Sequence, residues 1–266
     1  MLVDSHCHLD RVDLTHHQNS LAEVLSAAQH RGVSAFLCVC ISAENKDQVL
    51  AIADSFPSVV ASVGTHPSNV DEKAISPEEL IIWADHPRVV ALGESGLDYH
   101  YTRDSAQVQQ ESFKSHLLAG AQLDLPVIVH TREAKADTLN LIRTYGSPES
   151  AGVMHCFTED WDMAKAAMDL NYMISISGIV TFRNAEALRD VVKKMPMDRL
   201  LVETDSPYLA PIPFRGKPNV PQYVREVADY IAELKGVSVE QLAEQTTANF
   251  LRLFKRAGPL LPNLQG

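Results

Sequence analysis

Short runs of apolar, often β-branched residues alternate along the chain with longer segments whose apolar residues recur at helical spacing. The short runs predict eight strands, over Leu2–Ser5, Ser34–Ile41, Val59–Gly64, Val89–Gly93, Val127–His130, Gly152–Cys156, Met173–Ser177 and Leu200–Glu203. The segments between them predict helices. In the first, Leu21, Val24, Leu25 and Ala28 share one face, and Gly32 stands where a helix C-cap belongs.

This alternation predicts a parallel sheet with its helices outside, because right-handed crossovers connect parallel strands. Eight repeats within 266 residues favour a single α/β domain, a (β/α)8 TIM barrel, over an open doubly wound sheet. No glycine-rich fingerprint opens the first helix, so a dinucleotide-binding fold has no support. We expect the barrel to occupy residues 1–256, and residues 257–266, with Pro259, Pro262 and Gly266, to form a flexible tail.

Composition indicates an ordinary soluble globular protein, with 45% apolar and 21% charged residues. Apolar runs such as Ala35–Ile41 are too short to cross a bilayer, and the first residues show no secretory pattern. The cysteines Cys7, Cys38, Cys40 and Cys156 lie in strand-like segments, which is typical of buried reduced thiols. These features predict a cytoplasmic protein that does not contact membranes.

The net charge of −11 argues against broad, nonspecific attraction to nucleic acid. It is compatible with a phosphodiester substrate, because bound divalent cations and a few arginines can reverse the local potential. No segment of the sequence indicates an obligate protein partner.

Two histidines carry the first chemical signal. His6 and His8 follow the apolar start Leu2–Val3 with one residue between them. Side chains on an extended strand alternate with a period of two, so both imidazoles project to the same face. Paired imidazoles can bind a divalent metal ion; the alternative is a pair of surface histidines.

Four more ligand-type residues stand at the carboxyl ends of other predicted strands. They are Glu94 after the fourth strand, His130 at the end of the fifth, His155 at the end of the sixth and Asp205 after the eighth. Active sites of such barrels form at this end, where several strands converge. One histidine at a strand end is usually a packing residue. Gathering six such groups without a cation would be costly, so the pattern predicts a metal site.

Six ligands exceed the needs of one four-coordinate ion, so we expect two divalent ions. His6, His8 and Asp205 would bind the first ion. His130 and His155 would bind the second ion, and Glu94 would bridge the two. Two ions about 3.5–4 Å apart can hold a hydroxide between them, and coordination lowers the pKa of water towards about 7. Asp205 would accept the proton of that water. The predicted reaction is hydrolysis.

The identity of the ions stays open at this stage. Histidine-rich ligation suits Zn²⁺, Mn²⁺ or Fe²⁺, whereas oxygen ligands and phosphate substrates suit Mg²⁺.

Five segments together resemble the signature blocks of the TatD family of metal-dependent deoxyribonucleases, within the amidohydrolase superfamily. They are Asp4–His8, Gly93–Tyr99, Val129–Arg132, His155–Phe157 and Glu203–Pro207. The resemblance runs from residue 4 to about Asn249. It implies a metal-dependent barrel with 3′→5′ exonuclease or related DNase activity, acting on single-stranded DNA or 3′ ends. It also implies that the metal ligands are the six residues already singled out: His6, His8, Glu94, His130, His155 and Asp205.

Five further residues are candidates for catalysis or substrate binding. His66, after the third strand, matches a family histidine near the substrate and is expected to bind a phosphate oxygen or assist proton transfer. Arg132 is placed to clamp a phosphate, and Glu203 to orient a ligand or a water. Arg215 and Lys217 lie on the proline-rich segment after the eighth strand; they would guide a nucleotide strand, or be solvated surface charges.

The chain departs from the common family pattern at two places. Ser95 stands where an apolar residue or cysteine often follows the metal-site glutamate. A familiar Arg-Gly-Lys-Arg-Asn-Glu run has Pro218 and Val220 here, which removes one basic and one acidic residue. These changes leave the ligand set intact and concern contacts with the substrate strand.

Three hypotheses follow. The first is a two-metal phosphodiesterase acting on DNA ends. The second is a small-molecule amide, ester or phosphoester hydrolase on the same scaffold, favoured by the acidic net charge and the weakened basic loop. The third is a metal-stabilised binding module without catalysis.

Overall fold

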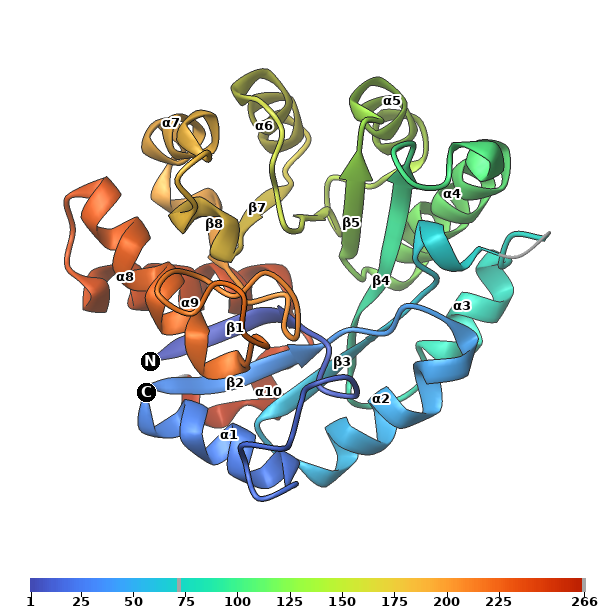
Figure 1. Cartoon of the computed structure of the whole chain (residues 1–266). Helices are drawn as coiled ribbons and strands as arrows, with labels where there is room; N and C mark the ends of the chain where they lie inside the picture. Colours follow the sequence, from blue (N-terminus) through green and yellow to red (C-terminus); the bar gives the residue numbers. More distant parts are fainter. Residues whose placement is uncertain (71–72, 265–266) are drawn as a thin grey trace.

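The strands form one parallel sheet that curls into a barrel, with helices around it (Figure 1). This computed structural model describes residues 1–70 and 73–264. Each strand pairs with the next in the chain, and all eight predicted strands are present, so the predicted (β/α)8 barrel is confirmed. The strands are β1 (Leu2–Cys7), β2 (Val33–Cys38), β3 (Val59–Val63), β4 (Val89–Asp98), β5 (Val127–Arg132), β6 (Gly152–Met154), β7 (Met173–Ile176) and β8 (Leu200–Val202).

Within residues 1–70 and 73–264, seven helices connect successive strands and three follow β8. They are α1 (Leu21–His30), α2 (Ala43–Ser55), α3 (Pro77–Trp83), α4 (Ala106–Leu123), α5 (Lys135–Tyr145), α6 (Trp161–Asp169), α7 (Glu186–Lys194), α8 (Val224–Lys235), α9 (Val239–Leu253) and α10 (Ala257–Leu260). Short 3-10 helices are η1 (Pro67–Asn69), η2 (Arg103–Ser105), η3 (Gly178–Thr181), η4 (Met197–Arg199), η5 (Pro221–Tyr223) and η6 (Pro262–Leu264). Among the described residues, no helix combines the length and apolarity needed to span a bilayer.

The first and last strands meet just beyond their carboxyl ends. A parallel β-bridge joins Cys7 to Ser206. The amide of His8 donates to the Ser206 carbonyl at 2.8 Å, and the amide of Asp205 donates to the His6 carbonyl at 2.9 Å. The backbone that closes the barrel is therefore the same backbone that carries three of the predicted metal ligands.

The apolar core has an outer and an inner part because side chains alternate along each strand. On β2, Phe36 and Cys38 belong to the outer cluster, under the helices, whereas Ala35 and Leu37 belong to the inner one. Every strand contributes to the inner cluster, through Val3, Ala35, Leu37, Val60, Val90, Ala91, Ile128, Val153, Met173 and Leu201. Most of these residues lie near the strand starts, so the metal-ligand end of the barrel is left for polar groups.

The inner cluster also receives the end of the chain. The prediction of a flexible tail over residues 257–266 is wrong for residues 257–264, because α10 and η6 pack against the barrel. Ala257, Leu261 and Leu264 are buried together with Phe250 and Phe254, whose rings lie 4.6 Å apart. The prolines and glycine suggested fraying, but the apolar residues between them cover the amino-terminal opening of the barrel. Residues 265–266 of the predicted tail lie outside the described residues.

A buried histidine on α4 anchors the loop that follows β3. His116 is fully buried, and its Nδ1 lies 2.7 Å from the carbonyl of Ser112, to which it donates. Its Nε2 accepts the amide of Thr65 at 3.1 Å. Burial lowers the pKa of His116 to about 4. The folded protein therefore holds this ring neutral.

We expect His116 to make stability depend on pH. The unfolded side chain takes up a proton near its ordinary pKa of 6.5, whereas the folded one resists protonation down to about 4. The unfolded state thus binds more protons in this window, so the free energy of unfolding falls as pH falls through it, by up to about 3 kcal/mol. Urea unfolding of wild type and His116→Gln from pH 7 to about 4 measures this, since the variant should lose that share of the slope. His30→Gln, on an exposed site, should keep the wild-type slope; parallel profiles for all three proteins would contradict the prediction.

Candidate metal centre

The structure brings all six predicted ligands together at the carboxyl end of the barrel. His6 lies in β1 and His8 directly after it, while His155 and Asp205 follow β6 and β8. Glu94 and His130 differ from expectation, because they lie inside strands that continue beyond them. The ligand role of each residue stays a prediction; their proximity is a feature of the fold.

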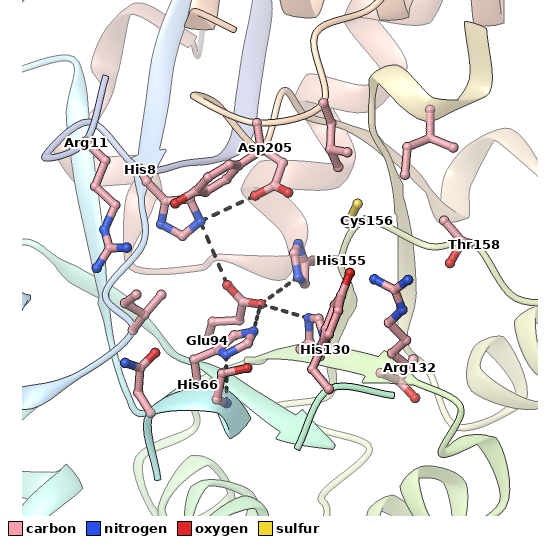
Figure 2. Close-up of a pocket in the computed structure, with 18 residues that line it drawn as sticks. His8, Arg11, His66, Glu94, His130, Arg132, His155, Cys156, Thr158 and Asp205 are labelled. Atoms are coloured by element: carbon pink, nitrogen blue, oxygen red, sulfur yellow. Dashed lines mark hydrogen bonds and ion pairs between the residues drawn. The ribbon is translucent and has the colours of Figure 1, made fainter. Parts of the chain in front are cut away.

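Glu94 occupies the centre of this group, and its two oxygens face different sets of histidines (Figure 2). Oε2 lies 3.3 Å from Nε2 of His6 and 4.0 Å from Nε2 of His8. Oε1 lies 2.8 Å from Nε2 of His155 and 3.2 Å from Nδ1 of His130. The carboxylate thus stands between the two pairs of histidines that the sequence assigned to separate ions.

Asp205 completes the first set. Its Oδ1 lies 3.3 Å from Nε2 of His8 and 3.6 Å from Nε2 of His6. Ligand atoms of these three residues all lie within 4.8 Å of one another, close enough to share one ion. This is the grouping expected from the sequence.

The second set includes a residue that the sequence assigned to the substrate. Nε2 of His66 lies 3.2 Å from Oε1 of Glu94. His66, Glu94 and His130 form a compact group of potential ligands, and His155 approaches the same Glu94 oxygen. A role of His66 in binding substrate is compatible with this position, because its ring also lines the cavity above.

Two outer carboxylates hold the histidines of the second set. Oε1 of Glu203, a fully buried residue, lies 3.4 Å from Nδ1 of His155 and accepts the amide of Cys156 at 2.8 Å. Oδ2 of Asp98 lies 3.2 Å from Nε2 of His130. Such carboxylates fix the orientation and basicity of a metal-binding imidazole. The position of Glu203 is compatible with its expected orienting role, whereas the contact of Asp98 with His130 emerges only from the structure.

The local backbone explains how Glu94 reaches the centre. The register between β4 and β5 shifts between Leu92 and Ser95, so β4 is irregular where it carries the carboxylate. Gly96 has a φ of +137°, and a Cβ there would collide with the carbonyl of His130. This close approach requires glycine and brings β4 against the strand that carries His130.

Asp205 also depends on unusual backbone. Its φ is +57°, in the left-handed region that non-glycine residues seldom adopt. The fully buried Asp4 holds the preceding residue, since its carboxylate accepts the amide of Thr204 at 2.9 Å and the hydroxyl at 2.6 Å. Burial raises the pKa of Asp4 to about 8, although the bonds from Thr204 lower it. Asp4 therefore ties the strand of His6 to the loop of Asp205.

The electrostatics of the site follow from burial and from mutual contact. Burial alone would raise the pKa of Glu94, but His155 and His66 hold it well below its ordinary value. Burial would lower the pKa of His155, but Glu94 and Glu203 raise it well above its ordinary value. His6 shows the opposite outcome, since burial and nearby His155 lower its pKa. The centre thus combines an ionised carboxylate with imidazoles whose pKa values are shifted in opposite directions, so protonation of His155 disfavours protonation of His6.

The residues present fit divalent cations. The ring nitrogens of His6 and of His155 are buried and make no hydrogen bond among the described residues, although carboxylate oxygens of Glu94 and Glu203 lie close to three of them; Oε2 of Glu203 also lacks a hydrogen-bond partner there. The two rings stack at 3.9 Å between centroids. Unpaired buried polar atoms are costly, and a cation coordinated by the imidazoles would remove that cost. The mixture of imidazole and carboxylate donors suits transition metals better than Ca²⁺.

A cavity of 820 Å³ opens above the centre, lined by Glu94, His130 and Asp205 among others. Arg132 lines it, as expected for a phosphate contact. The cavity lining does not include Arg215 or Lys217. The Arg215 guanidinium lies 4.3 Å from the ring centroid of Phe182, and Lys217 is exposed. The geometry therefore supports substrate contact for Arg132 and does not for the two loop residues.

Among the cavity residues that sequence reasoning did not select are Arg11, Tyr101 and Tyr208. All three lie in loops that leave carboxyl ends of strands, which is the one signal that marks them. Neither an arginine nor a tyrosine in a loop is specific enough to be selected without the fold.

Known proteins resemble this chain over nearly its whole length. The model of a family described as TatD related DNase matches residues 3–255. A relative from Escherichia coli (strain K12), called uncharacterized metal-dependent hydrolase YcfH, is 51% identical, covering 95% of each chain. The crystal structure of YjjV, a TatD homolog from Escherichia coli K12, has a TM-score of 0.88 and 30% identity, covering 96% of this chain and 98% of that one.

A more distant likeness concerns the fold alone. The phosphotriesterase homology protein of Escherichia coli superposes with a TM-score of 0.65 at 16% identity, over 97% of each chain. The barrel, its histidine–carboxylate centre and the relatives define an α/β-barrel metal-dependent hydrolase. Within that class the chain belongs to the TatD related DNase family.

We expect the two ligand sets to be separable. Replacing both His6 and His8 by alanine removes two of the three groups in the first set, whereas the second set keeps Glu94, His130 and His155. Elemental analysis should show a fall from about two metal equivalents per chain to about one. The pair His16→Ala and His30→Ala, at two exposed positions, should retain both. Two equivalents in the His6, His8 variant would show that this division of ligands is wrong.

Glu203→Gln tests the orienting role of Glu203. The amide oxygen can still accept the Cys156 amide, but His155 loses its anionic partner. We expect metal affinity to fall about 10- to 100-fold while the fold persists, as measured by competition with a chelating dye and by circular dichroism. Glu186→Gln, at an exposed position on α7, is the matched control. Equal affinity in both variants would contradict the role.

Proposed function

We propose that this protein is a deoxyribonuclease that hydrolyses phosphodiester bonds at 3′ ends of single-stranded DNA, with two divalent ions held at the barrel centre. The observation that carries the proposal is the placement of Glu94, one oxygen facing each histidine set, on the floor of the cavity. The family description supports DNA as the substrate. The 3′→5′ polarity comes from the resemblance of the sequence motifs.

The residues present suggest how the ions would be held. His6, His8 and Asp205 would hold one ion, His130 and His155 the other, and Glu94 would contact both. When bound, Mg²⁺, Mn²⁺ or Zn²⁺ would lower the pKa of a coordinated water and offset the charge of a phosphate.

The protein's own groups would supply the remaining chemistry. Burial raises the pKa of Asp205, but His8 and the neighbouring histidines lower it overall, so the carboxylate is ionised and can accept a proton from the attacking water. Arg132 would bind a phosphate oxygen with its planar guanidinium. His66 would contact the phosphate or assist proton transfer from the cavity wall, and Glu203 would keep His155 oriented.

The direct test is a nuclease assay on the full chain. Protein stripped with a chelator is reloaded separately with Mg²⁺, Mn²⁺ or Zn²⁺ and incubated with single strands labelled at the 5′ end, whose progressive shortening reports 3′→5′ digestion. Strands blocked by terminal phosphorothioates at either end determine the polarity. No nucleotide release with any ion, in protein shown to be metal-loaded, would rule out the proposal.

Asp205→Asn should reduce kcat by about 10²- to 10⁴-fold, because the amide cannot accept the proton of the water. The measurement is the single-turnover rate at saturating metal and DNA, which separates this effect from weaker metal binding. Asp198→Asn, in η4 and away from the cavity, should behave as wild type. A variant rate within about threefold of wild type would exclude Asp205 as the base.

One observation favours a second candidate, a small-molecule hydrolase. The chain carries a net charge of −11, and neither Arg215 nor Lys217 lines the cavity. A panel of amides, esters and phosphoesters distinguishes the candidates if kcat/KM for one of them exceeds that for DNA. The cytoplasmic location and the lack of an obligate protein partner stay predictions from the sequence.

A further inference from the structure

Two exposed tyrosines line the cavity that opens onto the metal centre. Tyr101 is 68% and Tyr208 48% exposed, and both belong to the cavity lining. Among the described residues, few large apolar side chains are this exposed. Exposed aromatic surface at the mouth of a site is typical of a binding surface.

Tyr101 is held on the side of the second ligand set. Oδ1 of Asp98 accepts the amide of Tyr101 at 2.8 Å, while the other oxygen of that carboxylate contacts His130. The Arg132 guanidinium lies 4.6 Å from the centroid of the Tyr101 ring. Asp98 therefore supports both Tyr101 and a predicted metal ligand, and strand pairing places Arg132 opposite Asp98.

Tyr208 is held on the side of the first ligand set. Its amide donates to the carbonyl of Asp205 at 2.9 Å, and its ring lies 6.0 Å from the ring of His8. Arg11 is its cationic neighbour: burial lowers the pKa of Arg11, but hydrogen bonding to Tyr208 and the charge of Asp10 raise it overall. A tyrosine and an arginine therefore lie together here too, although Arg11 contacts the Tyr208 hydroxyl whereas Arg132 lies over the ring of Tyr101.

The two pairs lie on different walls of the cavity. Figure 2 shows Arg11 and Arg132 on opposite sides of Glu94, with the cavity between them. Each wall thus offers an aromatic face for a planar group and a guanidinium for an anion. A nucleotide presents these two features together, as a base and a phosphate.

We infer that the Tyr101–Arg132 and Tyr208–Arg11 pairs are two base-binding subsites, one on each side of the phosphate that lies over Glu94. The inference rests on the proposed phosphodiester hydrolysis and specifies its substrate as two adjacent unpaired nucleotides. Bases in a duplex are stacked on one another and paired, so they cannot occupy both walls. The acidic chain would use these four side chains in place of a broad basic surface.

The test compares leucine and phenylalanine at each tyrosine. Tyr101→Leu and Tyr208→Leu remove the aromatic face and should each raise KM for a short single strand about 5- to 100-fold, with kcat within about twofold. Tyr101→Phe keeps the ring and should stay close to wild type. Tyr208→Phe keeps the ring but loses the hydroxyl that contacts Arg11, so its KM should rise less than that of Tyr208→Leu. Tyr145→Leu, on α5 and outside the cavity lining, is the matched control.

Strands that are abasic at their last two nucleotides give a second readout. Wild type should bind and cleave them as poorly as the leucine variants, and the variants should lose little further. If the leucine substitutions weaken binding and cleavage of abasic strands as much as those of intact strands, the subsites are overturned, because the tyrosines would then act on the fold or on the metal centre.

Binding by fluorescence anisotropy separates this inference from the proposed hydrolysis. If wild type cleaves DNA and both leucine variants keep its DNA affinity and KM, the subsites are overturned and the nuclease proposal stands. Ring-dependent binding of single strands without cleavage under any metal supports the subsites and overturns the nuclease proposal. Neither binding nor cleavage by wild type overturns both.

Discussion

The structure depends on the burial of one carboxylate. Glu94 is 3% exposed at the centre of the barrel mouth, and histidines from several strands surround it. An isolated carboxylate there would cost several kcal/mol, and removing one partner of a buried charged pair typically costs about 3–5 kcal/mol. The barrel is therefore arranged around positive charge, whether supplied by protonated imidazoles or by cations. This need explains why so many ionisable groups are tolerated at one end of an otherwise apolar fold.

The histidines can serve this carboxylate only if the barrel closes correctly. The junction of β1 and β8 carries His6, His8 and Asp205, and Asp4 ties its two sides through Thr204. A small displacement there would move one ligand set relative to Glu94 while the other set, on β5 and β6, stayed in place. The geometry of the centre therefore depends directly on correct closure of the barrel between β1 and β8.

Much of this was predictable from the sequence, because periodicity defines strands and the ends of parallel strands must converge. That logic identified the eight strands and the six residues around the centre. It could not place Glu94 inside β4, since the register shift beside Leu92 has no signature in hydrophobic spacing. Nor could it find Tyr101 or Tyr208, because the path of a loop follows from hydrogen bonds such as those of Asp98. The prediction of a flexible tail was wrong for residues 257–264, because it gave more weight to the prolines than to the apolar residues between them, which are buried.

The packing of that last segment has a consequence for how the protein is made. Leu261 and Leu264 share the inner cluster with Val3, and the hydroxyl of Thr247 on α9 donates to the carbonyl of Met1 at 3.0 Å. Contacts between segments this far apart in the chain form late, because the second segment must first be synthesised and the loop between them is long. A nascent chain that still lacks residues 257–264 would hold a barrel that is open at its base. The barrel interior is therefore sealed only once this segment has been made, and a chain truncated before it would present apolar surface to the cell's proteases.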